Sequence, residues 1–594
     1  MDDTSVSHAE PAVPRADMRV DIVCTGFGPA TAGFLTTLGR AVLNDDGTTR
    51  IESTAMPGLP LQVLCFERAD DLAAGVSGVV SRARGIRTSF PEFASAGVPL
   101  SSPVTDEQIV YLLDPVGASR RSRPLRAIDA MLRAGARLLG VDRHGVRLPY
   151  IPPFLRKHDG VVLSLGQFQQ WVAGQVMASG AAQIWPASPV AGPLFADDGA
   201  RVTGVRMVDQ GTDLRGAPTD AYAPGMDVFA DLTVVGDGPI GAVGQALDAK
   251  FGLPDGHVRD EWALGMKMVV DLRDDVDLAP GTVIHTIGYP EPEIFGFLYV
   301  LAPRTVSLGI FVPSWFDSPL RTAYRYLQHW MLHPWLWRWL EGGTLRSWGA
   351  KSVQESGRRG EPVLVGDGYA RIGEGSGSTN PLSGSGVDEA WTTGAQLAEG
   401  VIELLSRGEP FTRDALERAY VQRRRASWVE RELRVAEGAR DGFTRGVVWG
   451  LAGMALAGLT GGALRIPRRH GQAHPRLATT MSADAWMDAQ GWPAVPFDGR
   501  LLVTHQDALL MGGKVQAAPG YADHVRFDDL SQCRECTTHL CVSMCSGQAI
   551  TDAEAGGVAF DREKCVHCGA CLWNCPDDNV RFTAGAGGLH AVEN

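Results

Sequence analysis

The chain has 594 residues, of which 55 are basic and 68 are acidic, so its formal net charge is −13. This length allows about three or four domains, and the 44% hydrophobic and 21% charged residues are typical of globular proteins. The composition excludes a disordered or fibrous chain, and the acidic balance argues against nucleic acid as the main partner. Residues 1–18 have neither a basic start nor an apolar run, so we expect a disordered lead rather than a secretory signal.

A dinucleotide-binding motif follows the lead. An apolar run at residues 19–25 predicts a β-strand, and the next residues, Gly26-Phe27-Gly28-Pro29-Ala30-Thr31-Ala32-Gly33, predict a tight turn that opens a helix. Such a turn lets backbone amides and the helix N-terminus meet a pyrophosphate. A second apolar run, residues 61–66, ends at Glu67, which is suited to bind ribose hydroxyls. The expected nucleotide contacts are Gly26, Gly28, Pro29, Ala30, Gly33 and Glu67.

A later glycine-rich segment favours FAD over NAD as the nucleotide. Residues 363–367 predict a strand that ends at Gly366-Asp367, and residues 380–386 (NPLSGSG) open another helix. An aspartate at a strand end can bond the ribityl chain of a flavin, and a helix N-terminus can stabilise negative charge on the reduced ring. The expected contacts in this segment are Gly366, Asp367, Pro381, Gly384 and Gly386.

A further glycine motif, residues 236–241, fits GxGxxG and follows an apolar run at residues 231–235. It has two interpretations: a separate NAD(P)H-binding domain, or a strand that returns the chain to the FAD domain. No strand that ends in an acidic residue follows at the usual distance. The pattern therefore favours the return strand.

Eight of the ten cysteines lie in two runs near the C-terminus. Their spacings are Cys533-x2-Cys536-x4-Cys541-x3-Cys545 and Cys565-x2-Cys568-x2-Cys571-x3-Cys575-Pro576. The second run is that of bacterial ferredoxins, in which the last cysteine ligates the other cluster, and the first run is a widened variant. Zinc is disfavoured because three closely spaced cysteines crowd a tetrahedral ion. We predict one [4Fe-4S] cluster on Cys533, Cys536, Cys541 and Cys575, and a second on Cys545, Cys565, Cys568 and Cys571.

Further motifs carry a resemblance to a known family. They are residues 90–93 (FPEF), 97–105 (GVPLSSPVT), 265–267 (GMK), 285–290 (HTIGYP), 340–343 (LEGG) and 427–429 (SWV), with Leu165-Gly166, Trp171 and His333-Pro334. Together with the FAD loop and the cysteine runs, in this order, residues 20–594 resemble the electron-transfer flavoprotein:ubiquinone oxidoreductase family. The resemblance includes the flavoprotein relatives associated with nitrogen fixation, here with a fused two-cluster ferredoxin module.

The resemblance implies a fold of three parts. These are an α/β FAD-binding domain of the Rossmann-like, glutathione-reductase type, an interleaved α+β quinone-binding domain, and a C-terminal α+β bacterial-type ferredoxin domain. The implied boundaries are 19–160 for the first part of the FAD domain, 161–355 for its return strand and the quinone or substrate domain, 356–440 for the second FAD part, 441–520 for a membrane-surface and linker region, and 521–594 for the ferredoxin domain.

The resemblance also implies an activity, in which electrons pass from a reduced electron-transfer flavoprotein through [4Fe-4S] clusters and FAD to membrane quinone. The family's quinone lies beside a glycine pair that matches Phe295-Gly296, so the first glycine is replaced here. The family enzyme has one cluster, which matches the group containing Cys568. Two alternatives remain: a flavin-dependent reductase of isoprenoid or lipid double bonds, fed by the ferredoxin module, and an electron-relay subunit of a bifurcating flavoprotein complex.

Two segments are candidates for membrane contact. Residues 446–464 are 19 uncharged residues, long enough for a spanning helix, but six are glycine, and the resemblance favours monotopic insertion. We expect the protein on the cytoplasmic face of a prokaryotic membrane. The arginine-rich segment 117–147 has no counterpart in the family and carries Leu125, Ile128, Met131 and Leu132 at helical spacing. It is interpreted as a basic amphipathic helix on anionic lipid, as a helix packed on the domain, or as a dock for the donor.

Overall fold

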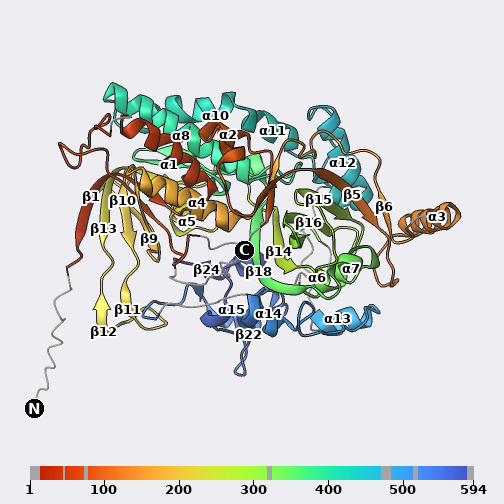
Figure 1. Cartoon of the computed structure of the whole chain (residues 1–594). Helices are drawn as coiled ribbons and strands as arrows, with labels where there is room; N and C mark the ends of the chain where they lie inside the picture. Colours follow the sequence, from red (N-terminus) through yellow and green to blue (C-terminus); the bar gives the residue numbers. More distant parts are fainter. Residues whose placement is uncertain are drawn as a thin grey trace, which may run out of the picture.

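The computed structural model describes residues 14–44, 47–72, 78–140, 142–316, 324–469, 483–512 and 519–584. Most of the expected lead, residues 1–13, lies outside these ranges, and the first strand already begins at Asp17. The chain forms two large sheets with helices around them and a small cysteine-rich module below (Figure 1).

The first sheet has the parallel arrangement expected of an FAD-binding domain. Its central strand β1 (Asp17–Thr25) is buried from Val20 onward, as is usual for a parallel strand covered on both faces. It pairs in parallel with β2 (Val63–Phe66) on one side and β13 (Asp227–Val235) on the other. The sheet also contains β8 (Gln183–Trp185), β9 (Val190–Phe195), β10 (Val202–Met207), β19 (Val365–Gly366) and β20 (Tyr369–Arg371). Its helices are α1 (Pro29–Val42), α2 (Arg84–Ser89), α4 (Leu165–Ala178), α5 (Ala242–Phe251) and α8 (Val387–Arg407).

The position of β13 decides between the two interpretations of the second glycine motif. Since β13 runs parallel to β1 in the same sheet, the motif at residues 236–241 follows a return strand of the FAD domain, as predicted. The Asp237 carboxylate accepts hydrogen bonds from the backbone amides of Val243 and Gly244, at 2.9 and 3.1 Å, and so caps α5.

The second sheet is mostly antiparallel and includes residues expected in the FAD domain. Its strands, in spatial order, are β18 (Thr344–Gln354), β14 (Trp262–Asp271), β17 (Thr305–Pro313), β16 (Phe295–Ala302), β15 (Thr282–Ile287), β5 (Asp106–Leu112) and β6 (Gly145–Arg147). β5 pairs in parallel with β15, which lies 176 residues later in the chain. The boundary predicted at residue 160 is therefore wrong for β5 and β6. Helices α3 (Arg123–Leu139), α6 (Tyr324–Met331) and α7 (Pro334–Leu340) belong to this part of the chain.

Shorter elements connect these sheets. A three-stranded sheet consists of β3 (Val79–Ser81), β7 (Val161–Leu163) and β4 (Ser101–Pro103), and a hairpin of β11 (Gln210–Thr212) and β12 (Pro218–Ala223). The remaining helices before the cysteine module are α9 (Arg413–Leu416), α10 (Gln422–Ala426), α11 (Trp428–Ala436), α12 (Val447–Leu459), α13 (Ala483–Ala489) and α14 (His505–Gly512). Across the described ranges, every helix falls short of the length and apolarity that crossing a bilayer demands.

The cysteine-rich module has the βαββαβ order of a small ferredoxin-like domain. Its elements are β21 (Val525–Phe527), α15 (Leu530–Glu535), α16 (Leu540–Ser543), β22 (Ile550–Asp552), β23 (Val558–Phe560), α17 (Ala570–Asn574) and β24 (Val580–Phe582). The module docks on β18, where the Ser352 amide donates to the Cys568 carbonyl at 2.9 Å and the Trp573 indole N–H donates to Ser352 Oγ at 2.8 Å. Trp573 also stacks on Trp262 of β14, with ring centroids 6.3 Å apart. The second cysteine run is thereby held against the second sheet.

Candidate functional site

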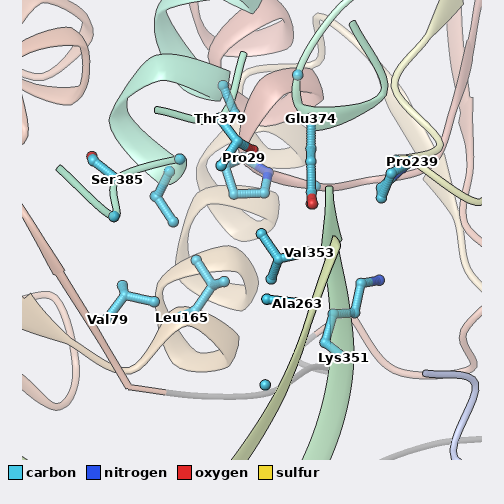
Figure 2. A pocket seen from close by; sticks show the side chains of 18 of the residues that line it. Pro29, Val79, Leu165, Pro239, Ala263, Lys351, Val353, Glu374, Thr379 and Ser385 are labelled. Atoms are coloured by element: carbon cyan, nitrogen blue, oxygen red, sulfur yellow. The ribbon is translucent and has the colours of Figure 1, made fainter. Parts of the chain in front are cut away.

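One large cavity, with a volume of about 840 Å³, connects all three parts of the fold. This is at the upper end of the size of cofactor and ligand sites. Figure 2 shows Pro29 at the start of α1, Glu374 after β20 and Val353 of β18 around the same space. The cavity is therefore bounded by the glycine turn, by the second sheet and by the loop that precedes α8.

The glycine turn after β1 is shaped to receive a ligand. Gly26 has a φ of +79°, and a Cβ there would lie 2.9 Å from the Asp237 backbone, so the turn requires glycine. At Gly28, in contrast, a Cβ would meet no atom within 4 Å, since this position faces the open cavity. Pro29 is in the first turn of α1, where its missing N–H has no helical partner to lose. Gly26, Gly28, Pro29 and Ala30 all line the cavity, and their contact with FAD stays a prediction that this placement suits.

Gly33 does not line the cavity, contrary to the prediction. A Cβ at Gly33 would lie 2.4 Å from the carbonyl oxygen of Trp391 in α8. The glycine is needed because α1 and α8 approach each other closely there. This is the third role of glycine in such motifs, close packing rather than ligand contact.

Glu67 lies at the cavity wall, directly after β2, as the sequence predicts. Its carboxylate accepts hydrogen bonds from the amides of Phe27, at 2.7 Å, and Ala69, at 2.9 Å. These bonds fix the carboxylate beside the glycine turn. The adjoining Arg68 was not predicted; it lines the cavity and contacts the imidazole of His567.

The predicted pair Gly366-Asp367 is not at the cavity. It lies in the turn between β19 and β20, which are antiparallel, and the Asp367 carboxylate accepts the amide hydrogen of Arg413 at 2.7 Å near the surface. The strand that runs parallel to β13 and ends at the cavity is β20, so the acidic residue there is Glu374. Glu374 accepts a hydrogen bond from the Gln354 amide at 2.9 Å, and burial raises the pKa of its carboxyl. The sequence signal for it was the glycine-rich run 373–377.

The loop before α8 also lines the cavity. Two predicted FAD contacts, Gly384 and Gly386, are part of the wall, and the Lys157 ammonium donates to the Ser383 carbonyl at 3.2 Å. Pro381 is not part of the wall; it packs beside Gly357 instead. The loop is held by Asn380, whose side-chain oxygen accepts from two following backbone amides.

The wall retains polar atoms that suit a polar ligand. Thr25 Oγ1, Gln169 Oε1 and Ser383 Oγ are buried and have no hydrogen-bond partner among the described residues. Buried polar atoms are nearly always paired in proteins. Their position, with the open face of Gly28 and the N-termini of α1 and α8, fits FAD, whose pyrophosphate and ribityl groups supply partners.

The other end of the cavity is mostly apolar. It is lined by Phe295, Phe297 and Phe311 of the second sheet, by Pro152, Phe154 and Leu155 of the segment after β6, and by Leu451, Met454 and Ala455 of α12. The predicted pair Phe295-Gly296 is part of this wall. A Cβ at Gly296 would lie 2.4 Å from the indole nitrogen of Trp330, so this glycine is required by packing.

Three polar side chains, those of His285, Tyr299 and Lys267, interrupt this apolar end. His285 Nε2 lies 2.9 Å from the Tyr299 hydroxyl, and both residues line the cavity. Burial lowers the pKa of His285 to about 3, so its imidazole is neutral near pH 7. Lys267 lies on the same wall and donates to the Gly78 carbonyl at 3.1 Å, and burial lowers its pKa to about 8. Sequence analysis assigned none of these residues a role, because only the fold brings β14, β15 and β16 together.

The first four cysteines converge as the spacing predicts. Cys533, Cys536, Cys541 and Cys575 line one small internal space, although Cys575 comes from the second run. The side-chain amide of Asn579 donates to Cys533 Sγ at 3.2 Å, and its backbone amide donates to Cys575 Sγ at 3.3 Å. These donors favour thiolates and tune an iron–sulfur cluster. The assignment of these four as ligands stays a prediction that the geometry suits.

The second group lies closer to the large cavity. Burial raises the pKa of the Cys545, Cys565 and Cys571 thiols, and the neighbouring Cys568 lies near enough to each of them to raise it further. The amides of Ala549 and Ile550 donate to Cys545 Sγ, at 3.1 and 3.4 Å.

Two histidines connect this group with the cavity. His524 Nε2 lies 3.1 Å from Cys565 Sγ, and the His524 ring stacks on that of His567 with centroids 4.0 Å apart. His567 lies between two cysteines in the sequence and lines the cavity. Polar atoms of His524, Cys565 and His567 lie within 4.8 Å of one another. His567 thus connects the cysteine module with the cavity lined by the glycine turn. Its position between Cys565 and Cys568 in the sequence does not predict this role.

Comparisons with known proteins agree with this site. The model of a ubiquinone-binding domain of ETF-QO matches residues 262–353, which are the strands from β14 to β18, and a 4Fe-4S binding domain model matches residues 558–581. The probable electron transfer flavoprotein-ubiquinone oxidoreductase of Acinetobacter baylyi is 24% identical over 97% of this chain and 98% of its own length. The mitochondrial electron transfer flavoprotein-ubiquinone oxidoreductase of Dictyostelium discoideum is 27% identical over 75% of this chain and 68% of its own.

A solved structure shares the fold. It is a geranylgeranyl bacteriochlorophyll reductase-like protein from Thermoplasma acidophilum, with a TM-score of 0.50 and 15% identity, covering 81% of this chain and 98% of that one. The fold, the cavity and the two cysteine groups define an FAD- and iron–sulfur-dependent oxidoreductase with [4Fe-4S] clusters. Within this class, the chain is a relative of the electron-transfer flavoprotein:ubiquinone oxidoreductases.

Proposed function

We propose that this protein transfers electrons from a reduced electron-transfer flavoprotein, through its [4Fe-4S] clusters and FAD, to a membrane quinone. The observation that carries the proposal is the single cavity with three kinds of wall. One end is the glycine cradle for FAD, another is the apolar space between the second sheet and α12, and His567 of the cysteine module lines the same space. One connected cavity thus has a wall suited to bind a flavin, a wall suited to bind a lipophilic acceptor, and a wall formed by the cysteine module that would bring electrons from the donor.

The cofactors account for the electron count. When bound, FAD exchanges one or two electrons, while each cluster exchanges one, and quinone takes up two electrons and two protons to form quinol. In this chain, the residues suited to hold FAD are Gly26, Gly28, Pro29, Ala30 and Glu67, with Gly384 and Gly386. The acidic residue on this wall after β20 is Glu374, because Asp367 lies away from the cavity.

The apolar end suits the quinone. Three phenylalanine side chains and α12 line it, and the Phe295-Gly296 pair, which the resemblance implies as a quinone contact, is part of the same wall and so supports the assignment. We assign the hydrogen-bonded pair His285 and Tyr299 to the proton chemistry of quinone reduction, because general acids act through direct hydrogen bonds. Lys267 on the same wall supplies positive charge near the reacting oxygen atoms.

The surface around the apolar end suits peripheral attachment to a membrane. Trp449, Leu456 and Leu459 of α12 are exposed large apolar residues, beside the mouth of the cavity. Such a patch marks a contact with a partner or a lipid phase. None of the ten cysteines, all of which lie within the described residues, forms a disulfide in the structure, which is typical of a reducing compartment. We therefore place the protein on the cytoplasmic face of a prokaryotic membrane.

An anaerobic titration tests the function. The holoprotein is mixed with reduced electron-transfer flavoprotein while its flavin and cluster absorbance are followed, and a quinone analogue is then added. Bleaching followed by recovery on quinone addition is expected. Bleaching without recovery would mean that another acceptor, such as an isoprenoid double bond, takes the electrons. Bleaching by NADPH alone would mean that NADPH, and not the electron-transfer flavoprotein, is the donor.

A cysteine variant checks the route. Cys568→Ser should lose one cluster, about half of the bound iron, and nearly all turnover with the flavoprotein donor, while it keeps FAD because the glycine cradle is untouched. Cys24→Ser, which changes a buried cysteine of β1 outside the module, is the matched control for iron content. Full donor-dependent turnover by Cys568→Ser would refute the role of this cluster.

A further inference from the structure

Helix α3 projects from the body of the molecule and is largely exposed (Figure 1). It is inserted between the paired strands β5 and β6, and of its 17 residues only Asp129 and Ala136 are buried. The Asp129 carboxylate anchors it, because it accepts hydrogen bonds from the Tyr111 hydroxyl at 2.8 Å and from Arg121 at 2.7 Å. The helix is therefore held firmly while most of its surface faces outward.

The exposed surface of α3 has two chemically distinct faces. Met131 is 67% exposed, Leu138 88% and Leu139 77%, and Ile128 lies on the same side. With 3.6 residues per turn, Ile128 and Leu139 lie beside the side that packs on the domain, while Met131 and Leu138 lie farther round and face away from it. The apolar face is therefore much wider than the contact that covers it. Opposite to it lies a basic face, formed by Arg123, Arg126, Arg133 and Arg137.

The basic face is not neutralised by the protein. Asp129, the one acidic residue of α3, is buried and paired with Arg121. Among the described residues, no ion pair involves Arg123, Arg126 or Arg137. An acidic chain of net charge −13 thus presents a local basic stripe beside exposed leucine and methionine side chains.

This surface continues into the apolar surface around α12. After β6 the chain continues through Tyr150, which is exposed, to Phe154. The Phe154 ring packs closely on α12, since a Cβ at Gly458 of α12 would lie 2.2 Å from it. Figure 1 shows α3 and α12 on the same side of the molecule. The segment that joins them also lines the mouth of the cavity, through Pro152 and Phe154.

We propose that α3 is a second membrane-contact element, which lies along an anionic phospholipid surface. Its apolar face enters the boundary between headgroups and acyl chains, and its arginines contact lipid phosphates. This inference rests on the membrane attachment in the proposed function and assigns a role to the arginine-rich segment 117–147. Together with α12, α3 fixes the orientation in which the cavity mouth faces the bilayer.

Vesicle binding of the full-length holoprotein tests the inference. The vesicles contain phosphatidylcholine alone or with phosphatidylglycerol, and the charge variant is R123Q/R126Q/R137Q. Each arginine near an anionic surface contributes roughly fivefold to binding, so the variant should bind anionic vesicles roughly 100-fold more weakly at low salt. Its weaker binding to neutral vesicles should be unchanged. The apolar variant L138Q/L139Q should lose affinity for both kinds of vesicle.

A matched control removes the same charge elsewhere. Arg50, Arg215 and Arg431 are exposed arginines outside the patch, and R50Q/R215Q/R431Q should bind within about twofold of wild type. All variants should retain bound FAD and the thermal unfolding midpoint of wild type. The proposal would be overturned if the α3 charge variant bound anionic vesicles as tightly as the wild type does. Normal vesicle binding combined with a raised KM for the electron-transfer flavoprotein would also overturn it, because α3 would then be a protein dock.

A soluble assay separates this inference from the proposed function. With reduced flavoprotein and a short-chain quinone analogue in detergent, the α3 charge variant should turn over as wild type does. If the wild type itself reduces no quinone while the vesicle results hold, the proposed function fails and the lipid surface stands. If the wild type turns over but binds no anionic vesicle, the lipid surface fails and the proposed function stands.

Discussion

Replacement of Gly28 by valine should weaken FAD binding without unfolding the protein. Gly28 is the N-cap of α1, with a φ of −97°, which any L-residue adopts. A Cβ there would meet no protein atom within 4 Å, because the position opens into the cavity. The added side chain therefore fills ligand space rather than protein space. The change in the free energy of unfolding of the apoprotein should stay within about 0.5 kcal/mol.

The loss of affinity follows from the bonds that the side chain displaces. A hydrogen bond between a backbone amide and a charged group contributes about 1.5–3 kcal/mol. Loss of one such bond to the pyrophosphate corresponds to roughly 10- to 100-fold weaker binding, since about 1.4 kcal/mol is a factor of ten. Gly28→Ala, with a smaller side chain, should fall between wild type and Gly28→Val.

Gly26→Ala is the contrasting control. Its φ of +79° and the 2.9 Å approach of a Cβ to Asp237 mean that this substitution strains the turn itself. It should lower the thermal unfolding midpoint of the apoprotein, which Gly28→Val leaves unchanged. The assay is fluorescence titration of deflavinated protein with FAD, alongside thermal unfolding. If Gly28→Val binds FAD with the wild-type Kd, the cradle is not where the nucleotide lies.

Three further substitutions test the site and its support. Tyr299→Phe removes the hydroxyl beside His285 and should lower kcat for quinone reduction about 10- to 100-fold at unchanged flavin content; an unaltered rate would exclude this pair from proton transfer. Glu361→Ala strips a buried partner from the fully buried Arg424 and should cost about 3–5 kcal/mol in stability, seen as a lower unfolding midpoint. Burial raises the pKa of Glu291 to about 7, so the folded protein retains a proton that the unfolded chain releases above about pH 4.5. Wild-type stability should therefore fall from pH 5 to 8, and this decline should be smaller in Glu291→Gln; parallel midpoint curves would contradict the assignment.

The glycine turn could be read from sequence because its constraints are local. A buried strand, a turn with glycine at Gly26 and proline in the first helical turn all lie within a dozen residues. The cysteine groups were also predictable, since the exchange of Cys545 and Cys575 between runs is a fixed consequence of the ferredoxin spacing. In the structure, Cys575 lies with the cysteines of the first group, as that spacing requires.

The placement of Asp367 and of β5 could not be predicted, because pairing between strands distant in the sequence decides both. Asp367 and Glu374 both follow short apolar runs and glycine, so local pattern alone did not separate them. The decisive fact is that β20, not β19, runs parallel to β13, and this places Glu374 at the cavity. In the same way, β5 joins the second sheet through β15, which no feature near residues 106–112 indicates.

The two cysteine groups are not equivalent with respect to the cavity. His567, next to Cys568, lines the cavity, while the space enclosed by Cys533, Cys536, Cys541 and Cys575 is separate from it. Cys571 lies between the two groups, close enough that Cys541, Cys565 and Cys568 each raise the pKa of its thiol. With both groups loaded, the second would be the one placed to exchange electrons with a flavin in the cavity, and the first would extend the route away from it.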